Sequence, residues 1–151
     1  MTVFLVRHAS AGVRNNSDAN DLQRALDDIG HGQAAAIADH LADEGITAIR
    51  SSRALRCTQT LGPLSMRLDL EVQPEPALLE GSSTGRVLEF LRGLPAEPVA
   101  LCSHGDIIPD AIRALEVGGM HIMGERRFPK GCVWRLERDP DTFISATCTV
   151  L

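Results

Sequence analysis

Two histidines of the sequence each follow a run of apolar residues, and their neighbours are suited to phosphate chemistry. His8 comes directly after Arg7, and His104 comes directly before Gly105. A neutral imidazole is a good nucleophile near pH 7, and a phosphohistidine intermediate divides hydrolysis into two easier steps. A guanidinium binds phosphoryl oxygens through planar, bidentate and permanently charged contacts. These residue types therefore indicate transfer of a phosphoryl group to a histidine.

The same layout occurs at three places along the chain. Apolar runs at residues 3–6, 46–50 and 99–103 predict buried strands, and polar side chains follow each of them. In an open parallel sheet, ligands bind beyond the carboxyl ends of the strands. If these three strands are parallel and adjacent, Arg7, His8, Arg56 and His104 converge at one edge, where His104 can stabilise a transition state by hydrogen bonding to a phosphoryl oxygen. This scheme needs no metal and no other cofactor, and we expect none.

Short apolar runs alternate with amphipathic segments, which is typical of an α/β domain. Strands are expected at residues 3–6, 46–50, 71–73, 99–103, 132–136 and 143–150. Helices are expected at residues 30–44, 53–67 and 84–94 and directly after Asp106, with Ser51 or Ser52 and Asp106 as caps and an interruption at Gly62-Pro63. Residues 117–129 are rich in glycine and are expected to be irregular.

Length and charge narrow the classes of protein. A chain of 151 residues fits a single domain over residues 1–151, and a net charge of −5 excludes a general attraction for polyanions. Aromatic residues make up 3%, too few for a base-stacking platform, so no nucleic-acid partner is expected. The run after Met1 has no basic segment before it and is too short to span a bilayer, so we expect a cytoplasmic protein without membrane contact. The cysteines are scattered and are expected to be reduced thiols.

Four motifs in order resemble those of a known family. Residues 6–9, Val-Arg-His-Ala, resemble the R-H-G signature of the histidine phosphatase superfamily, with Ala9 in place of the usual glycine. Residues 30–34 resemble its G-x-x-Q-A segment, residues 52–60 are similar to S-x-x-x-R-A-x-Q-T, and residues 103–106 match S-H-G-D. Within that superfamily the chain looks most like the small SixA-type phosphohistidine phosphatases and the domain fused to some Nudix hydrolases.

The resemblance implies a three-layer α/β/α sandwich with a mostly parallel central sheet. It also implies that His8 is the nucleophile, that Arg7 and Arg56 bind phosphate, and that His104 and Gly105 complete the phosphate site. The expected enzyme is a metal-independent phosphatase that acts on a phosphoester or phosphoramidate through a phosphohistidine. The alternative is a non-catalytic module that binds a phospho-ligand on the same fold.

Several positions remain open. Glu80 falls where many family members place a general acid, which a leaving alkoxide needs and a phosphoramidate does not. Larger members have a serine and an asparagine where this chain has Ala11 and Arg14, and the residue that completes the pocket is Ser10, Arg14, Asn15 or Asn16. Arg53 is the alternative to Arg56. The partner is a phosphorylated small molecule or a phosphohistidine protein, and the oligomeric state stays open.

Overall fold

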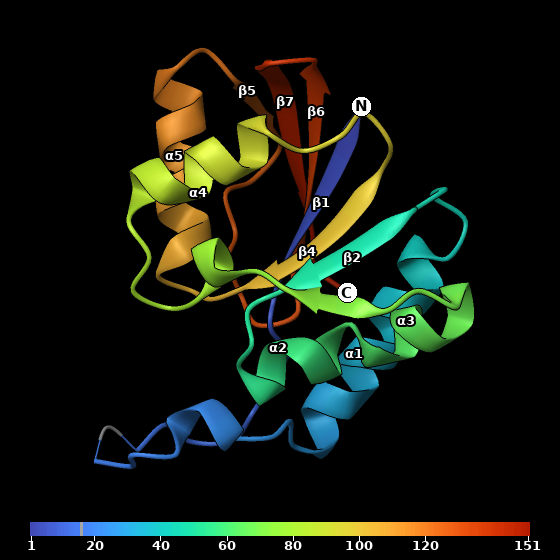
Figure 1. The fold of residues 1–151 in the computed structure, drawn as a ribbon, viewed down its shortest axis with the longest axis vertical. Coiled ribbons are helices and arrows are strands. Elements are labelled where there is room, and N and C mark those ends of the chain that lie inside the picture. Colours follow the sequence, from blue (N-terminus) through green and yellow to red (C-terminus); the bar gives the residue numbers. More distant parts are fainter. Residues whose placement is uncertain (16) are drawn as a thin grey trace.

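A computed structural model of the chain describes residues 1–15 and 17–151, whose strands form one sheet of seven (Figure 1). The order across the sheet is β3-β2-β4-β1-β6-β7-β5. The strands are β1 (Thr2–Arg7), β2 (Ala48–Ser51), β3 (Val72–Pro74), β4 (Val99–Ser103), β5 (His121–Met123), β6 (Val133–Asp139) and β7 (Thr142–Thr149). β6 pairs antiparallel with β1 and β7, and the other neighbours pair in parallel. The sheet is therefore mostly parallel, as predicted.

Helices cover both faces of the sheet, which confirms the predicted three-layer sandwich. They are α1 (Asp28–Leu41), α2 (Leu55–Thr60), α3 (Gly62–Leu68), α4 (Thr84–Arg92) and α5 (Ile107–Val117), with 3-10 turns η1 (Asp21–Gln23) and η2 (Pro76–Leu78). Figure 1 shows α1, α2 and α3 on one side of the sheet and α4 and α5 on the other. None of the described helices combines the length and the apolar character needed to cross a bilayer.

Alternate side chains of strand β1 pack into the hydrophobic cores on the two faces of the sheet. Phe4 and Val6 pack into the core beneath α1 and α3, whereas Val3 and Leu5 pack into the core beneath α4 and α5. All four side chains are buried, so the strand is a continuous apolar run without polar alternation. Its end is thereby fixed in the middle of the molecule, directly before the first histidine of interest.

Helix α1 holds the long loop that follows β1. The helix starts where the Asp27 side chain accepts the Gly30 N–H at 2.8 Å, two residues before the predicted start. A Cβ atom at Gly30 would lie 1.9 Å from the Ser10 carbonyl oxygen, so the loop packs directly on the first turn of the helix. The glycine of the G-x-x-Q-A segment is therefore required by this close approach.

The second helix confirms the predicted interruption at Gly62-Pro63 and contradicts the predicted cap. The chain forms two short helices, α2 and α3, and Pro63 lies in the first turn of the second one, so the helix is divided. The predicted serine cap is wrong, because Ala54 occupies the cap position of α2 without a side-chain hydrogen bond. Ser51 donates to the Ser52 carbonyl at 2.7 Å, and the Ser52 hydroxyl lies 2.8 Å from Nε2 of His104.

The glycine-rich segment at residues 117–129 contains a strand that the sequence did not predict. β5 pairs in parallel with β7, with Ile122 opposite Ala146, and forms an edge of the sheet. Gly119 and Gly124 flank it with positive φ angles of 116° and 84°. A strand of three residues is too short to show a hydrophobic period, which explains why it was missed.

Candidate active site

The carboxyl ends of β1, β2 and β4 meet in the middle of the sheet, because β4 pairs in parallel with both other strands. Arg7 lies opposite Ser103, and Ser51 lies opposite Cys102. The residues that follow these strands are therefore neighbours, as predicted. They line a pocket of about 380 Å³ with residues of adjoining loops: Arg7, His8, Arg14, Arg24, Arg56, Glu80, His104, Gly105, Asp106 and Lys130.

His8 is buried and neutral in this pocket. Its Nδ1 lies 2.8 Å from the Ala9 carbonyl oxygen. Because a carbonyl only accepts, Nδ1 carries the proton and Nε2 keeps its lone pair. Burial lowers the pKa of His8 to about 3, and the charges of His104, Arg56 and Arg7 act in the same direction against the hydrogen bond to Ala9. The imidazole is therefore in its neutral form at neutral pH, with the lone pair of Nε2 available.

His104 lies edge-on to His8, with ring centroids 5.5 Å apart. Its Nε2 lies 2.8 Å from the Ser52 hydroxyl, and its Nδ1 lies 3.4 Å from Nη2 of Arg56. A guanidinium only donates, so Nδ1 accepts here and Nε2–H donates to Ser52. The Cys57 thiol also contacts Nε2, with Sγ at 3.6 Å. These contacts hold the ring so that Nδ1 is turned toward the guanidinium of Arg56.

The guanidinium of Arg7 lies close to the backbone of Gly105 in the pocket. Its Nη1 donates to the Phe128 carbonyl, while its Nε is buried and has no hydrogen-bond partner among residues 1–15 and 17–151. A Cβ atom at Gly105 would lie 2.7 Å from both Cζ and Nη2 of Arg7. Gly105 therefore leaves the space in which this guanidinium lies.

Arg56 is only 1% exposed, although it is always charged. Its Nη1 donates to the Asp21 carbonyl at 2.9 Å, and its Nη2 lies 3.2 Å from carboxylate oxygens of both Asp21 and Glu80. Its Nε is buried without a partner in the described part of the chain. Burying a charge is costly unless it is paired and hydrogen-bonded. Two such guanidinium groups, at Arg7 and Arg56, suit an anion with several acceptor oxygens.

Arg138 shows that an unused Nε is not sufficient to mark a binding site. It is 5% exposed, and its Nε also lacks a partner among the described residues. Its other nitrogens donate to the carbonyls of Leu94, Pro95 and Pro140. These bonds hold two loops together, and no histidine takes part in them, so the role of this arginine is structural.

Glu80 lies between Arg14 and Arg56 at the mouth of the pocket, with 27% of its side chain exposed. Burial acts to raise the pKa of Glu80, but the hydrogen bond and charge of Arg14 and the charges of His104 and Arg56 outweigh it and lower the pKa. The carboxyl is therefore ionised in the empty pocket. In this state it can accept a proton but cannot donate one.

Of the four residues left open to complete the pocket, Arg14 lines it. The Ser10 hydroxyl donates to Asp27 at 2.7 Å, and the Asn15 amide oxygen accepts a backbone N–H of its own loop at 3.0 Å. Asn16 lies outside the described residues. Ser10 and Asn15 are thus occupied elsewhere, and Arg14 stands where larger members of the family have an asparagine.

The structure also shows where Arg53 and Asp106 lie relative to the pocket. Arg53 is exposed and lines a small separate cleft, so Arg56 is the arginine of this segment that enters the pocket. Asp106 occupies the N-cap position of α5, as predicted, but its side chain makes no capping hydrogen bond. Its Oδ2 instead accepts the Gly81 N–H at 2.9 Å, which ties the turn containing Glu80 to the start of that helix.

The remaining polar residues of the motifs support the loops. The Thr60 hydroxyl accepts the Ala9 N–H at 2.9 Å, and the Gln33 amide oxygen accepts the Ser10 N–H at 2.8 Å. Gln59 accepts a backbone N–H further along the same loop at 2.8 Å. These bonds satisfy buried backbone donors that would otherwise lack partners, and they hold the chain after His8 in place.

Three residues near the phosphate site were not singled out from the sequence. Arg24 and Lys130 line the pocket, and Asp21 binds Arg56 from behind it. The one hint was the spacing of Asp21 and Arg24, whose side chains pair at 3.1 Å across three residues. Loop residues show no period, so their neighbours in space could not be inferred from the pattern.

The comparison with known families agrees with this geometry. The sequence profile of the histidine phosphatase superfamily, branch 1, matches residues 3–88, which is more than half of the chain. The matched segment contains Arg7, His8, Arg56 and Glu80. The chain therefore belongs to the histidine phosphatase superfamily.

Individual relatives show the same fold. The protein histidine phosphatase SixA in complex with tungstate superposes with a TM-score of 0.76 over 99% of this chain and 95% of its own, at 23% identity. A mycobacterial glucosyl-3-phosphoglycerate phosphatase with bound VO3 gives a TM-score of 0.66 over 90% and 92%, at 19% identity. The 8-oxo-(d)GTP phosphatase of Mycolicibacterium smegmatis is 36% identical over 118 residues, which are 74% of this chain. This chain spans 36% of that relative's length.

Proposed function

We propose that this chain is a metal-independent phosphatase that hydrolyses a phosphoester or phosphoramidate through a phosphohistidine on His8. The proposal depends most on one observation. A neutral imidazole with a free Nε2 lies beside the guanidinium groups of half-buried Arg7 and buried Arg56, and the Nε of each is buried without a partner among the described residues. Membership of the histidine phosphatase superfamily supports the same chemistry.

In the first step, the phosphoryl group binds between Arg7 and Arg56, which neutralise its equatorial oxygens. Nε2 of His8 attacks phosphorus, so that an N–P bond forms while the bond from phosphorus to the leaving group breaks. When substrate is bound, the Ser52 hydroxyl donates to Nε2 of His104, and the Nδ1–H of the ring donates to a phosphoryl oxygen in place of its contact with Arg56. The space above Gly105 keeps Arg7 within reach of the same oxygens.

Glu80 gives the leaving group its proton when that group is an alkoxide. Burial acts to raise the pKa of this carboxyl, but the hydrogen bond and charge of Arg14 and the charges of His104 and Arg56 keep it ionised. A bound dianion takes over the charge of Arg56, which raises the proton affinity of Glu80 toward the range of a general acid. A phosphoramidate carries its own protonated nitrogen, so its cleavage does not require Glu80.

In the second step, water attacks phosphorus and gives its proton to the Glu80 carboxylate. The N–P bond breaks, His8 returns to its neutral form and inorganic phosphate leaves. The substrate is a phosphorylated small molecule or a phosphohistidine on a protein. The likeness to SixA supports the second, and the likeness to the mycobacterial 8-oxo-(d)GTP phosphatase supports the first.

The test is turnover of para-nitrophenyl phosphate with and without EDTA. We expect the wild-type rate to be unchanged by EDTA and to be lost in His8→Ala. His31→Ala is the matched control, because His31 is an exposed histidine on α1. Binding of phosphate without turnover by the wild type would instead indicate a non-catalytic phospho-ligand module. Undiminished turnover by His8→Ala would contradict the proposed nucleophile.

A further inference from the structure

Asp21 and Glu80 both bind the buried guanidinium of Arg56, but they are held in different ways. Each carboxylate lies 3.2 Å from the same nitrogen, Nη2. Asp21 makes a second contact, because its backbone carbonyl accepts Nη1 at 2.9 Å. Arg56 is therefore bound by two groups of Asp21, the carboxylate and the backbone carbonyl, and by one group of Glu80, its carboxylate.

The segment around Asp21 is braced at several points. The residue opens the turn η1, and its Oδ1 pairs with Nε of Arg24 at 3.1 Å. Arg24 in turn donates to the Ala11 carbonyl at 2.7 Å, and the Leu26 N–H is held by Gln59 at 2.8 Å. Moving Asp21 would thus break a set of bonds that tie the loop to the body of the domain.

Glu80 has more freedom. Its side chain is longer and partly exposed, and its other partner is Arg14, whose side chain is 50% exposed. An ion pair with so exposed a partner contributes little free energy. A dianionic phosphoryl group can therefore displace Glu80 from Arg56 at a small cost, whereas displacing Asp21 costs much more.

We infer that Asp21 is the positioning residue for Arg56: it remains bound to the guanidinium throughout the reaction, while Glu80 is the counter-ion that exchanges with the substrate. This inference depends on the proposed function for its role in turnover. It assigns Asp21 no contact with the substrate. Its effect is to aim the free Nε of Arg56, and the Nη2 donor that Glu80 leaves, at the position of the phosphoryl oxygens.

The orientation matters because a bidentate contact requires a fixed guanidinium plane. Without the Asp21 carboxylate, Arg56 keeps its charge but loses the group that fixes its plane. Asparagine at this position keeps an acceptor oxygen of the same reach. The expected order of activity is therefore wild type, then Asp21→Asn, then Asp21→Ala.

A double-mutant cycle with Arg56→Ala separates positioning from a general structural role. We expect Asp21→Ala to lower kcat/KM for para-nitrophenyl phosphate and the affinity for vanadate by about tenfold each, the size of coupling found for residues in contact. Asp21→Asn should recover most of both. In the Arg56→Ala background, Asp21→Ala should change either quantity by less than about twofold. Asp43→Ala, at an exposed position after α1 and outside this loop, is the control and should have no effect.

Two results would overturn the inference. One is a loss in Asp21→Ala that is equally large with and without Arg56, because it would mean that Asp21 acts on something else. The other is full activity and full vanadate affinity in Asp21→Ala. If Asp21→Ala does not fold, the comparison of Asp21→Asn with and without Arg56 decides in the same way. A wild type that binds vanadate but shows no turnover would contradict the proposed function, and the vanadate cycle would still test Asp21.

Discussion

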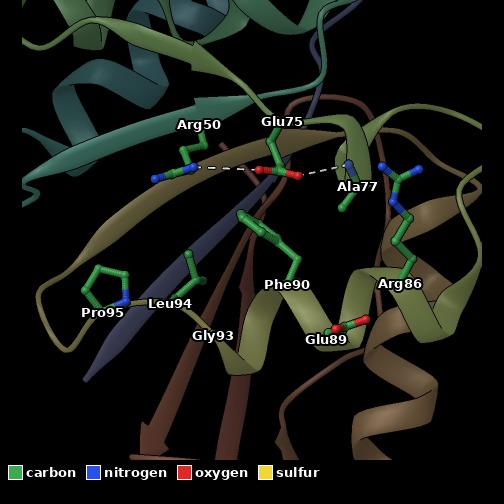
Figure 2. Close-up of a pocket in the computed structure, with 9 residues that line it drawn as sticks. All are labelled: Arg50, Glu75, Ala77, Arg86, Glu89, Phe90, Gly93, Leu94 and Pro95. Carbon is green, nitrogen blue, oxygen red and sulfur yellow. Dashed lines mark hydrogen bonds and ion pairs between the residues drawn. The ribbon is translucent and has the colours of Figure 1, made fainter.

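Two clefts of almost equal volume both contain arginines and carboxylates, but only one of them also contains histidines. The proposed phosphate pocket, at the carboxyl edge of the sheet, measures about 380 Å³, and a second cleft between β2 and α4 measures about 390 Å³ (Figure 2). The second cleft is lined by Arg50, Glu75, Ala77, Arg86, Glu89, Phe90, Gly93, Leu94 and Pro95. Figure 2 shows that it also contains arginines and carboxylates, but no histidine is among its lining residues.

The arginines of the two clefts are solvated differently. Arg50 in the second cleft is 38% exposed and lies 3.6 Å from Glu75, which also accepts the Ala77 N–H at 3.1 Å. Arg56 in the phosphate pocket is 1% exposed and keeps a buried Nε without a partner among the described residues. Water satisfies an exposed guanidinium, whereas a buried one with free donors favours an anion. Arginines with buried, unused donors beside two histidines, and not volume, distinguish the candidate active site.

We expect the largest difference in activity between variants of the two clefts when one carboxylate of each cleft is replaced by an amide. Glu80→Gln should lower kcat/KM for an alkyl phosphate by about 10²-fold, the lower end of what general acid catalysis contributes. Cleavage of para-nitrophenyl phosphate should suffer much less, because its leaving group is stable without a proton. Glu89→Gln, in the second cleft, should leave both rates unchanged. Equal losses on the two substrates would show that Glu80 does not act as the acid.

A methyl group added at one glycine of each cleft gives the next test. Gly105→Ala should lower kcat/KM on every substrate by up to about 10²-fold, because the new Cβ displaces the guanidinium of Arg7. Gly93→Ala should have no effect on turnover, since its Cβ would meet its nearest atom at an ordinary 3.5 Å. Steady-state kinetics of both variants would check this. An unaffected Gly105→Ala would mean that Arg7 need not lie where it does.

Arg50→Ala should change both the activity and the stability of the protein only slightly. The exposed pair with Glu75 contributes at most about 1 kcal/mol to the free energy of unfolding, and no reacting group lies in its cleft. Activity should stay within about twofold of wild type, while urea unfolding shows a small loss of stability. A large loss of turnover would make the second cleft part of the functional site and would break the comparison.

We expect the protonation state of His8 to stay constant over the pH range in which histidines usually titrate. Burial lowers its pKa to about 3, so the imidazole takes up a proton only as the pH falls toward that value. Between pH 8 and pH 5 its side-chain resonances should therefore stay constant in an NMR titration. A midpoint near 6.5 would show that His8 is more solvated than the structure has it.

The sequence predicted the parts of the site that follow from strands. Buried apolar runs followed by polar residues predicted that Arg7, His8, Arg56 and His104 meet at one sheet edge, and the resemblance to the superfamily added their roles. The pairing of Arg14 with Glu80 could not be predicted, because both lie in segments without a period. The sequence placed Asp106 correctly at the N-cap of α5, but it could not show that the carboxylate binds the backbone of a turn that is distant in sequence.

The phosphorylated intermediate is the most direct test of the account. Rapid quenching of the wild type with substrate, followed by mass spectrometry of peptides kept at alkaline pH, should find an acid-labile phosphoryl group on His8. The same experiment on His8→Ala should find none. A phosphoryl group on another residue, or turnover without any phosphorylated enzyme, would contradict the central claim that His8 is the nucleophile.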